Sequence, residues 1–195
     1  MKSKTGKKRC QILILQGSPN PKGNTARLAD EIARGAMASG AKVKEFFIQE
    51  HNIASCTACQ SCQEPKARGC IIDDDMDDIY KAALEADEIV FASPIYWFTV
   101  SAQIKQVIDR FYAFVTSDGH RFAGKRIGLA FTFGGDDAVD SGCINAIRTF
   151  QDAFAYINAP ICGMVYGSSG NGPVRKNKAL LQKAFALGKK LAKNG

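Results

Sequence analysis

The 195-residue sequence lacks several patterns that would place it in a large class of proteins. It contains no GxGxxG and no Gly-Lys-Ser/Thr sequence, which argues against a dinucleotide-binding Rossmann loop and against an ATP-binding P-loop. No apolar run approaches the roughly 18 residues that span a bilayer, so we expect no membrane segment. The two histidines, His51 and His120, are too few and too far apart to suggest a histidine metal site.

The net charge of +7 is unevenly distributed. Residues 1–9 form a basic tail with five Lys or Arg, residues 175–195 carry seven, and neither segment contains an acid. The rest of the chain is acidic, and no contiguous basic and aromatic stripe is present, so we expect no nucleic-acid partner. The apolar run behind the tail is too short for a signal peptide, which favours a cytoplasmic protein. In a reducing compartment, clustered cysteines hold metal or do redox chemistry more often than they form disulfides.

Strand and helix patterns alternate along the chain without a repeat or a linker, which predicts a single domain over residues 1–195. Apolar runs predict strands at 12–15, 42–49, 88–93, 125–133 and 161–166. Helical periodicity predicts helices at 25–37, 75–85, 101–114, 141–156 and 178–193. Residues 50–72 break the pattern as a cysteine-rich insertion after the second strand. The alternation predicts an α/β fold with a parallel sheet covered on both faces and ligands beyond the carboxyl ends of its strands.

The first strand runs through the loop GSPNPKGNT, residues 17–25, into a helix. First-turn amides have no partner within a helix, and the helix dipole adds positive charge there, so this junction favours an anion. Gly17 and Gly23 allow the backbone to come close to phosphate oxygens, and short polar donors follow at Ser18, Asn24 and Thr25. Without the sequence of a magnesium nucleotide site, the loop suits a phosphomonoester such as that of FMN. An ordinary turn with a helix cap remains the alternative.

Two further loops follow the third and fourth predicted strands. The second loop exposes aromatic residues where turns are usually polar, which would suit a planar isoalloxazine ring; its candidate residues are Pro94, Ile95, Tyr96, Trp97 and Phe98. The third loop could bring backbone amides to the ring through Thr132, Gly134, Gly135 and Asp136. A core or dimer-interface role for the aromatic residues, and an ordinary turn for the glycines, remain open.

The most specific feature is a run of four cysteines, Cys56-x2-Cys59-x2-Cys62-x7-Cys70. Three thiols at successive i, i+3 spacing can each bind one corner of a [4Fe-4S] cluster, and the fourth can return from a short loop. Zinc usually takes cysteines as separated pairs, so a zinc site is the second interpretation. Free thiols or a disulfide remain as the third.

The segments GSPNPKGNT and SPIYWFTVSAQIKQVIDR, with the order of elements, resemble the flavodoxin-like NAD(P)H-dependent FMN reductases. The cysteine insertion is similar to that of their iron-sulfur flavoprotein branch. The resemblance implies a doubly wound five-stranded parallel sheet of order 2-1-3-4-5 and a homodimer or homotetramer with FMN near a subunit interface. It also implies that the second and third loops hold the ring and that the phosphate is held by Ser18, Asn20, Asn24 and Thr25. Many relatives carry Arg where this chain has Asn20, so the phosphate loses a charged partner.

These patterns predict an FMN oxidoreductase with an adjacent iron-sulfur cluster, NAD(P)H as a possible donor, and a small molecule or redox protein as acceptor. The flavin itself does the chemistry, and no nucleophile and base pair stands out, so no catalytic side chain is predicted. One alternative is a cluster-free NAD(P)H-dependent FMN, quinone or azo-compound reductase. The other is a flavodoxin-like electron carrier that never meets a nicotinamide.

Overall fold

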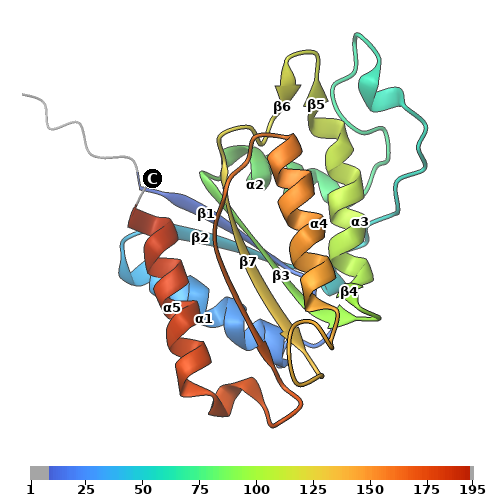
Figure 1. The fold of residues 1–195 in the computed structure, drawn as a ribbon. Coiled ribbons are helices and arrows are strands. Elements are labelled where there is room, and N and C mark those ends of the chain that lie inside the picture. The colour runs from blue at the N-terminus through green and yellow to red at the C-terminus, as the bar shows by residue number, and fades with distance from the viewer. Residues whose placement is uncertain (1–8, 194–195) are drawn as a thin grey trace, which may run out of the picture.

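The computed structural model describes residues 9–193, so positions 1–8 of the predicted basic tail lie outside the described chain. Five parallel strands form a sheet of order β2-β1-β3-β7-β8 (Figure 1). Numbered along the chain, this is the predicted order 2-1-3-4-5, and the flavodoxin-like fold is confirmed. The strands are β1 (Gln11–Gln16), β2 (Lys42–Phe47), β3 (Glu88–Tyr96), β7 (Arg126–Phe133) and β8 (Ile161–Ser168).

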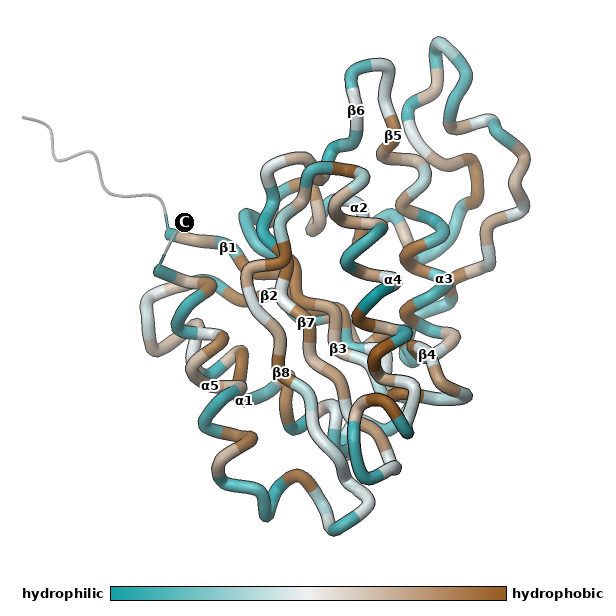
Figure 2. Tube along the Cα trace, viewed as in Figure 1, coloured by the Kyte–Doolittle hydropathy of each residue, from teal (hydrophilic) through white to brown (hydrophobic). Residues whose placement is uncertain are grey.

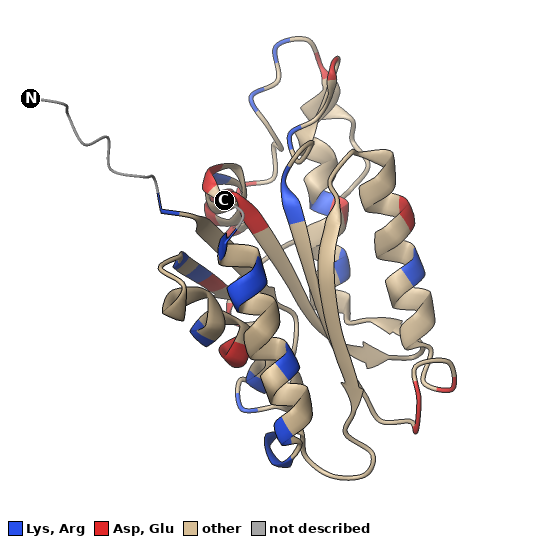
Figure 3. Cartoon of the chain, turned by 60° about the vertical axis from the view of Figure 1, so that its left-hand side comes forward, with Lys and Arg blue, Asp and Glu red and all other residues tan. Residues whose placement is uncertain are grey.

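Helices cover both faces of the sheet, as the alternation of strands and helices predicts (Figure 1). One face carries α1 (Asn24–Ala38) and α5 (Lys178–Lys193). The other carries α2 (Met76–Glu85), α3 (Ala102–Arg110) and α4 (Cys143–Tyr156). None of the helices within residues 9–193 is long and apolar enough to cross a bilayer. Figure 3 shows Lys and Arg along α5, where the basic C-terminal segment was expected to form a helix.

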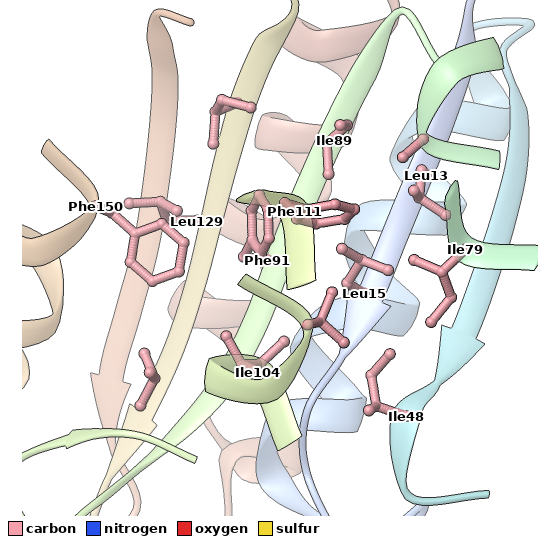
Figure 4. Packing of buried hydrophobic residues seen from close by; sticks show 14 of the residues in the cluster. Leu13, Leu15, Ile48, Ile79, Ile89, Phe91, Ile104, Phe111, Leu129 and Phe150 are labelled. Carbon is pink, nitrogen blue, oxygen red and sulfur yellow. The ribbon is translucent and has the colours of Figure 1, made fainter. Parts of the chain in front are cut away.

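The central strands are apolar along their length because both of their faces are buried (Figure 2). Leu13, Leu15 and Phe91 point to the face covered by α2, α3 and α4, where Phe91 meets Phe150 (Figure 4). The alternate residues Ile12 and Ile14 face α1 and α5. The unbroken apolar run in β1 therefore fills two separate cores.

Helices α1 and α5 approach one another so closely that only glycine fits at two positions. A Cβ added at Gly35 of α1 would meet the carbonyl oxygen of Phe185, and one added at Gly188 of α5 would meet the carbonyl oxygen of Ile32. The two backbones thus lie against each other, and α1 is held over the sheet by a contact that no side-chain rotation can relax.

Several predicted boundaries were wrong. β3 does not stop at Pro94 but pairs with β7 through Pro94 and Thr132, and continues to Tyr96. Proline is tolerated because the register of β1 ends opposite Ala92, so β3 has no β1 partner at that point. β2 ends at Phe47, before a 3-10 turn at Ile48–Glu50, and α3 gives way to a 3-10 turn at Phe111–Phe114.

Three short strands were not predicted. β4 (Thr99–Val100) folds back on the end of β3, and β5 (Val115–Thr116) pairs with β6 (Gly119–His120) beyond the end of α3. Each has only two residues, which is too short to show an alternating pattern. Both hairpins nevertheless matter, because each lies beside one of the candidate sites.

Candidate functional site

The loops after β1, β3 and β7 meet at the carboxyl ends of the strands, as predicted. The hydroxyl of Ser101 donates to the carbonyl of Gly17 at 2.7 Å, which joins the first loop to the second. The hydroxyls of Thr25 and Thr132 lie 2.6 Å apart, which joins the first loop to the third. All three predicted loops therefore form one bonded unit around the start of α1.

Helix α1 begins without a side-chain cap and without an acidic residue in its first turn. Its N-cap is Gly23, whose carbonyl accepts from the Arg27 amide. The amides that follow Gly23 have no acceptor within the helix. A Cβ at Gly23 would lie 3.0 Å from the carbonyl oxygen of Asn20, so the turn into the helix is tight. An uncapped helix start lined by a glycine turn is the arrangement that binds a phosphate.

The predicted phosphate-loop side chains mostly shape the loop itself. The Ser18 hydroxyl accepts from the Asn20 amide at 3.1 Å, and the Asn20 side-chain oxygen accepts from the Lys22 amide at 3.0 Å. The side-chain oxygen of Asn24 accepts from the Val174 amide at 3.0 Å. The Thr25 hydroxyl is buried against Thr132. These contacts leave the backbone amides at the start of α1 as the donors available to an anion.

The second loop is a two-residue turn between β3 and β4, with Trp97 and Phe98 at its tip. Both have positive φ, 46° and 63°, as a type I′ hairpin requires. Bulky residues rarely adopt this conformation, and Asn-Gly is the usual choice. Trp97 is 93% exposed, with Tyr96 and Phe98 about half exposed. The predicted aromatic surface is therefore present, while Pro94 and Ile95 are buried in the strand.

The third loop continues from β7 and is held in place by its neighbours. Gly134 has open space around it, and the carbonyl of Gly135 accepts from the Ser168 hydroxyl at the end of β8. Asp136 is exposed. The side chain of Asp137 accepts from the amides of Val139 and Asp140 at 2.7 and 2.9 Å, which folds the loop into a compact turn. Figure 3 shows the acidic residues gathered here.

A second group of residues, not predicted from the sequence, aligns the loops. The amide of Ser101 donates to the Ser93 hydroxyl at 2.9 Å, and the buried side chain of Gln16 accepts from the Ser18 amide at 2.9 Å. Asp137 belongs to the same group. A serine directly before a helix is a recognised cap, and Asp favours turns that return to its own backbone, so both patterns could have flagged these roles.

The four clustered cysteines lie at the opposite end of α3 from the three loops (Figure 1). Together they line one small cavity with Arg110 and Tyr112 as neighbours. The only regular element in the predicted insertion is a 3-10 turn at Ser61–Gln63. All four are free thiols, and within residues 9–193 no three His, Cys, Asp or Glu side chains stand at metal-binding distance.

The cysteine loop nevertheless has features that suit thiolate ligands. Ala58 and Gln60 both have left-handed φ, 54° and 63°, so the chain curls tightly around Cys59. Hydrogen bonds from the Ser61 amide and hydroxyl and from the Thr57 hydroxyl lower the pKa of the Cys59 thiol. Four thiols around one cavity, with one already biased towards the thiolate, are a donor set that fits a tetrathiolate metal group.

The structure separates the two candidate sites. Ser101 bonds to the first loop and Tyr112 lines the cysteine cavity, and the helical segment between them spans about 16 Å at 1.5 Å per residue. The expectation of a cluster adjacent to the flavin stays a prediction. The sequence could not place the cysteines at the far end of α3, because the insertion follows β2 in the chain.

Comparison with known proteins shows the family to which the chain belongs. Residues 10–172 match the NADPH-dependent FMN reductase family. An iron-sulfur flavoprotein from Archaeoglobus fulgidus is 30% identical over 181 residues, covering 90% of this chain and 76% of the relative. An iron-sulfur flavoprotein from Methanocaldococcus jannaschii is 31% identical over 161 residues, covering 82% and 78%.

Solved structures show the same fold at low identity. NAD(P)H:quinone oxidoreductase from Methanothermobacter marburgensis superposes with a TM-score of 0.75 at 17% identity, covering 96% of this chain and 98% of that one. An FMN-dependent NADH-azoreductase from Bacillus anthracis, solved in complex with FMN, gives 0.70 at 12% identity, covering 93% and 99%. The chain therefore belongs to the NADPH-dependent FMN reductase family, in its iron-sulfur flavoprotein branch, and is an FMN-dependent oxidoreductase.

Proposed function

We propose that this protein passes electrons between FMN at the three loops, a [4Fe-4S] cluster at the four cysteines, and an external acceptor. The observation that carries the flavin site is the uncapped start of α1, which opens between two loops that are bonded to it. The similarity to iron-sulfur flavoproteins and the donor set of four thiols around one cavity support the cluster.

The chain's own residues position the flavin. The backbone amides at the start of α1 and the side-chain amide of Asn24 bind the phosphate, and the nearby ammonium of Lys22 contributes charge where relatives have Arg at position 20. Trp97 and Phe98 give the ring an apolar face, and the amides after Thr132 reach its polar edge. When bound, FMN supplies the hydride and single-electron chemistry.

The separation of the two sites favours an oligomer. Because α3 keeps the cysteines about 16 Å from the loops in one subunit, we propose that each flavin exchanges electrons with the cysteine site of another subunit in a homodimer or homotetramer. Exposed apolar residues next to the hairpin, Val139 and Ile144, support a protein contact there. Free cysteines throughout residues 9–193 are consistent with a cytoplasmic location.

An anaerobic absorption spectrum with iron, sulfide and FMN analysis tests the proposal. We expect wild-type protein to contain all three, and Cys59→Ser to lose iron and sulfide while it keeps FMN. Cys162→Ser is the matched control, because this thiol bonds only to Arg126 and to the Pro160 carbonyl and lies outside the cysteine cavity. Protein without FMN would refute the flavin site. Steady NADPH oxidation with a quinone by iron-free protein would instead support a cluster-free reductase.

A further inference from the structure

The residue behind the cysteine cavity is Arg110, the last residue of α3 and a fully buried side chain with 1% exposure. Its two terminal nitrogens bind the carboxylate of Asp74 at 2.6 and 3.1 Å in a bidentate pair. Burial on its own would lower the pKa of Arg110, but the contact with Asp74 raises it, so the guanidinium stays charged inside the protein.

The same guanidinium holds both ends of the cysteine loop. One terminal nitrogen donates to the carbonyl of Ala54 at 2.8 Å, and the other donates to the carbonyl of Ile72 at 3.4 Å. Ala54 lies two residues before Cys56, and Ile72 lies two residues after Cys70. The Ala54 amide also donates to Asp74 at 2.9 Å. The whole segment that carries the four cysteines is therefore closed at its base by one ion pair.

One donor of Arg110 is left over. Its Nε–H is buried and has no hydrogen-bond acceptor among the described residues. Arg110 and Cys70 both line the cavity shared by the four cysteines. The Tyr80 hydroxyl donates to the Arg110 carbonyl at 2.8 Å. A buried and charged donor without an acceptor, on a residue that lines the cavity, favours an acceptor that arrives with a ligand.

We propose that Arg110 is a positioning residue of the cysteine site, which closes the loop and would donate its Nε–H to a sulfur of a cluster held by the four cysteines. This rests on the proposed function, since it requires the cluster. A hydrogen bond to a cluster sulfur favours the more negative, reduced form and so raises the reduction potential. A second effect is geometric, because the loop ends would separate without the planar fork of the guanidinium.

The variant Arg110→Lys tests both effects, because lysine keeps the charge and removes the fork and the Nε–H. Arg126→Lys is the matched control: Arg126 also pairs with a buried carboxylate, Glu88, at 2.6 Å, but it does not line the cysteine cavity. The readouts are iron and sulfide content and the midpoint potential from an anaerobic titration followed by EPR. We expect a tenfold shift towards the oxidised cluster in Arg110→Lys, equal to 59 mV for one electron, and no shift in Arg126→Lys. An unchanged potential in Arg110→Lys overturns the inference.

A measurement on unmodified protein decides the case if Arg110→Lys does not fold. Wild-type protein labelled with 15N at the arginine Nε, reduced and studied by pulsed EPR, should show a 15N hyperfine coupling to the cluster. A cluster without that coupling overturns the role of Arg110 and leaves the proposed function intact. Wild-type protein without iron and sulfide overturns the proposed function itself, and the inference with it.

Discussion

The strained aromatic hairpin allows a test in which stability and function move in opposite directions. The double variant Trp97→Asn/Phe98→Gly gives the turn the residues that a type I′ hairpin prefers. Left-handed backbone costs roughly 1–2 kcal/mol for each non-glycine residue, and losing the half-buried ring of Phe98 costs about 1 kcal/mol. The net gain in the free energy of unfolding is therefore about 1–3 kcal/mol, or about 3–9 °C in Tm for a domain of this size.

We expect the double variant to bind FMN more weakly, because it removes the two exposed rings. We expect the Kd for FMN, measured by quenching of flavin fluorescence, to rise about tenfold, equal to 1.4 kcal/mol. The apoprotein Tm would be measured by calorimetry. The control is Ser117→Asn/Asp118→Gly, which introduces the same two residues into the turn between β5 and β6, where neither position has positive φ.

Three results would refute this reasoning. A lower Tm for the apoprotein would show that Trp97 and Phe98 stabilise the fold and are not held there against their backbone preference. An unchanged Kd for FMN would show that the hairpin does not contact the ring. An equal rise in Tm in the control pair would mean that Asn-Gly stabilises any turn of this chain, whether or not it is strained.

Three further predictions concern single residues. Gly17→Ala would place a methyl group against the side chain of Ile104 and 2.8 Å from the Ser101 hydroxyl, so we expect a loss of about 1–3 kcal/mol by calorimetry and weaker FMN binding by titration. Gly134→Ala, with open space around it, should leave the stability unchanged. Burial raises the pKa of Glu88 to about 7, against the opposing effect of Arg126. The protonated Glu88 therefore contributes stability that is fully present below the pKa of the unfolded chain, and this contribution is lost as the pH rises through 7. The free energy of unfolding of wild-type protein, relative to that of Glu88→Gln, should therefore fall by up to about 3 kcal/mol between pH 4.5 and pH 7 in chemical denaturation. A difference between the two proteins that stays constant over this pH range would contradict the prediction. In cluster-free protein at neutral pH, iodoacetamide should alkylate Cys59 before Cys56, because hydrogen bonds from Ser61 and Thr57 lower the pKa of the Cys59 thiol, and mass spectrometry of timed samples would show the order.

Much of the fold could be predicted because the central strands are buried on both faces and each helix on one. The run in β1 and the helical period in α1 are direct consequences of where those residues pack. The loops that follow β1, β3 and β7 could be identified for the same reason, since a parallel sheet brings the carboxyl ends of its strands together. Their convergence around the start of α1 confirms that part of the prediction.

The roles of individual side chains were harder to predict, because they depend on contacts between distant segments. Thr25 looks like a phosphate donor in the sequence, yet its hydroxyl is bound to Thr132, 107 positions away. Arg110 looks like the last charged residue of an amphipathic helix, yet it closes the cysteine loop through Asp74. No local pattern encodes such pairings. No local pattern indicates either that the four cysteines lie at the far end of α3.

The contact between the glycines of α1 and α5 has a consequence for how a cofactor would enter. Since the backbones of these helices abut at Ile32 and Gly35, the second half of α1 is fixed against α5, which favours one orientation of its amide end before any ligand arrives. The aromatic hairpin on the other side is held by a two-residue strand and by a hydrogen bond from the Asn145 side chain to the Phe98 carbonyl. Association should therefore start with capture of the phosphate at an immobile end and finish with adjustment of Trp97 and Phe98 around the ring.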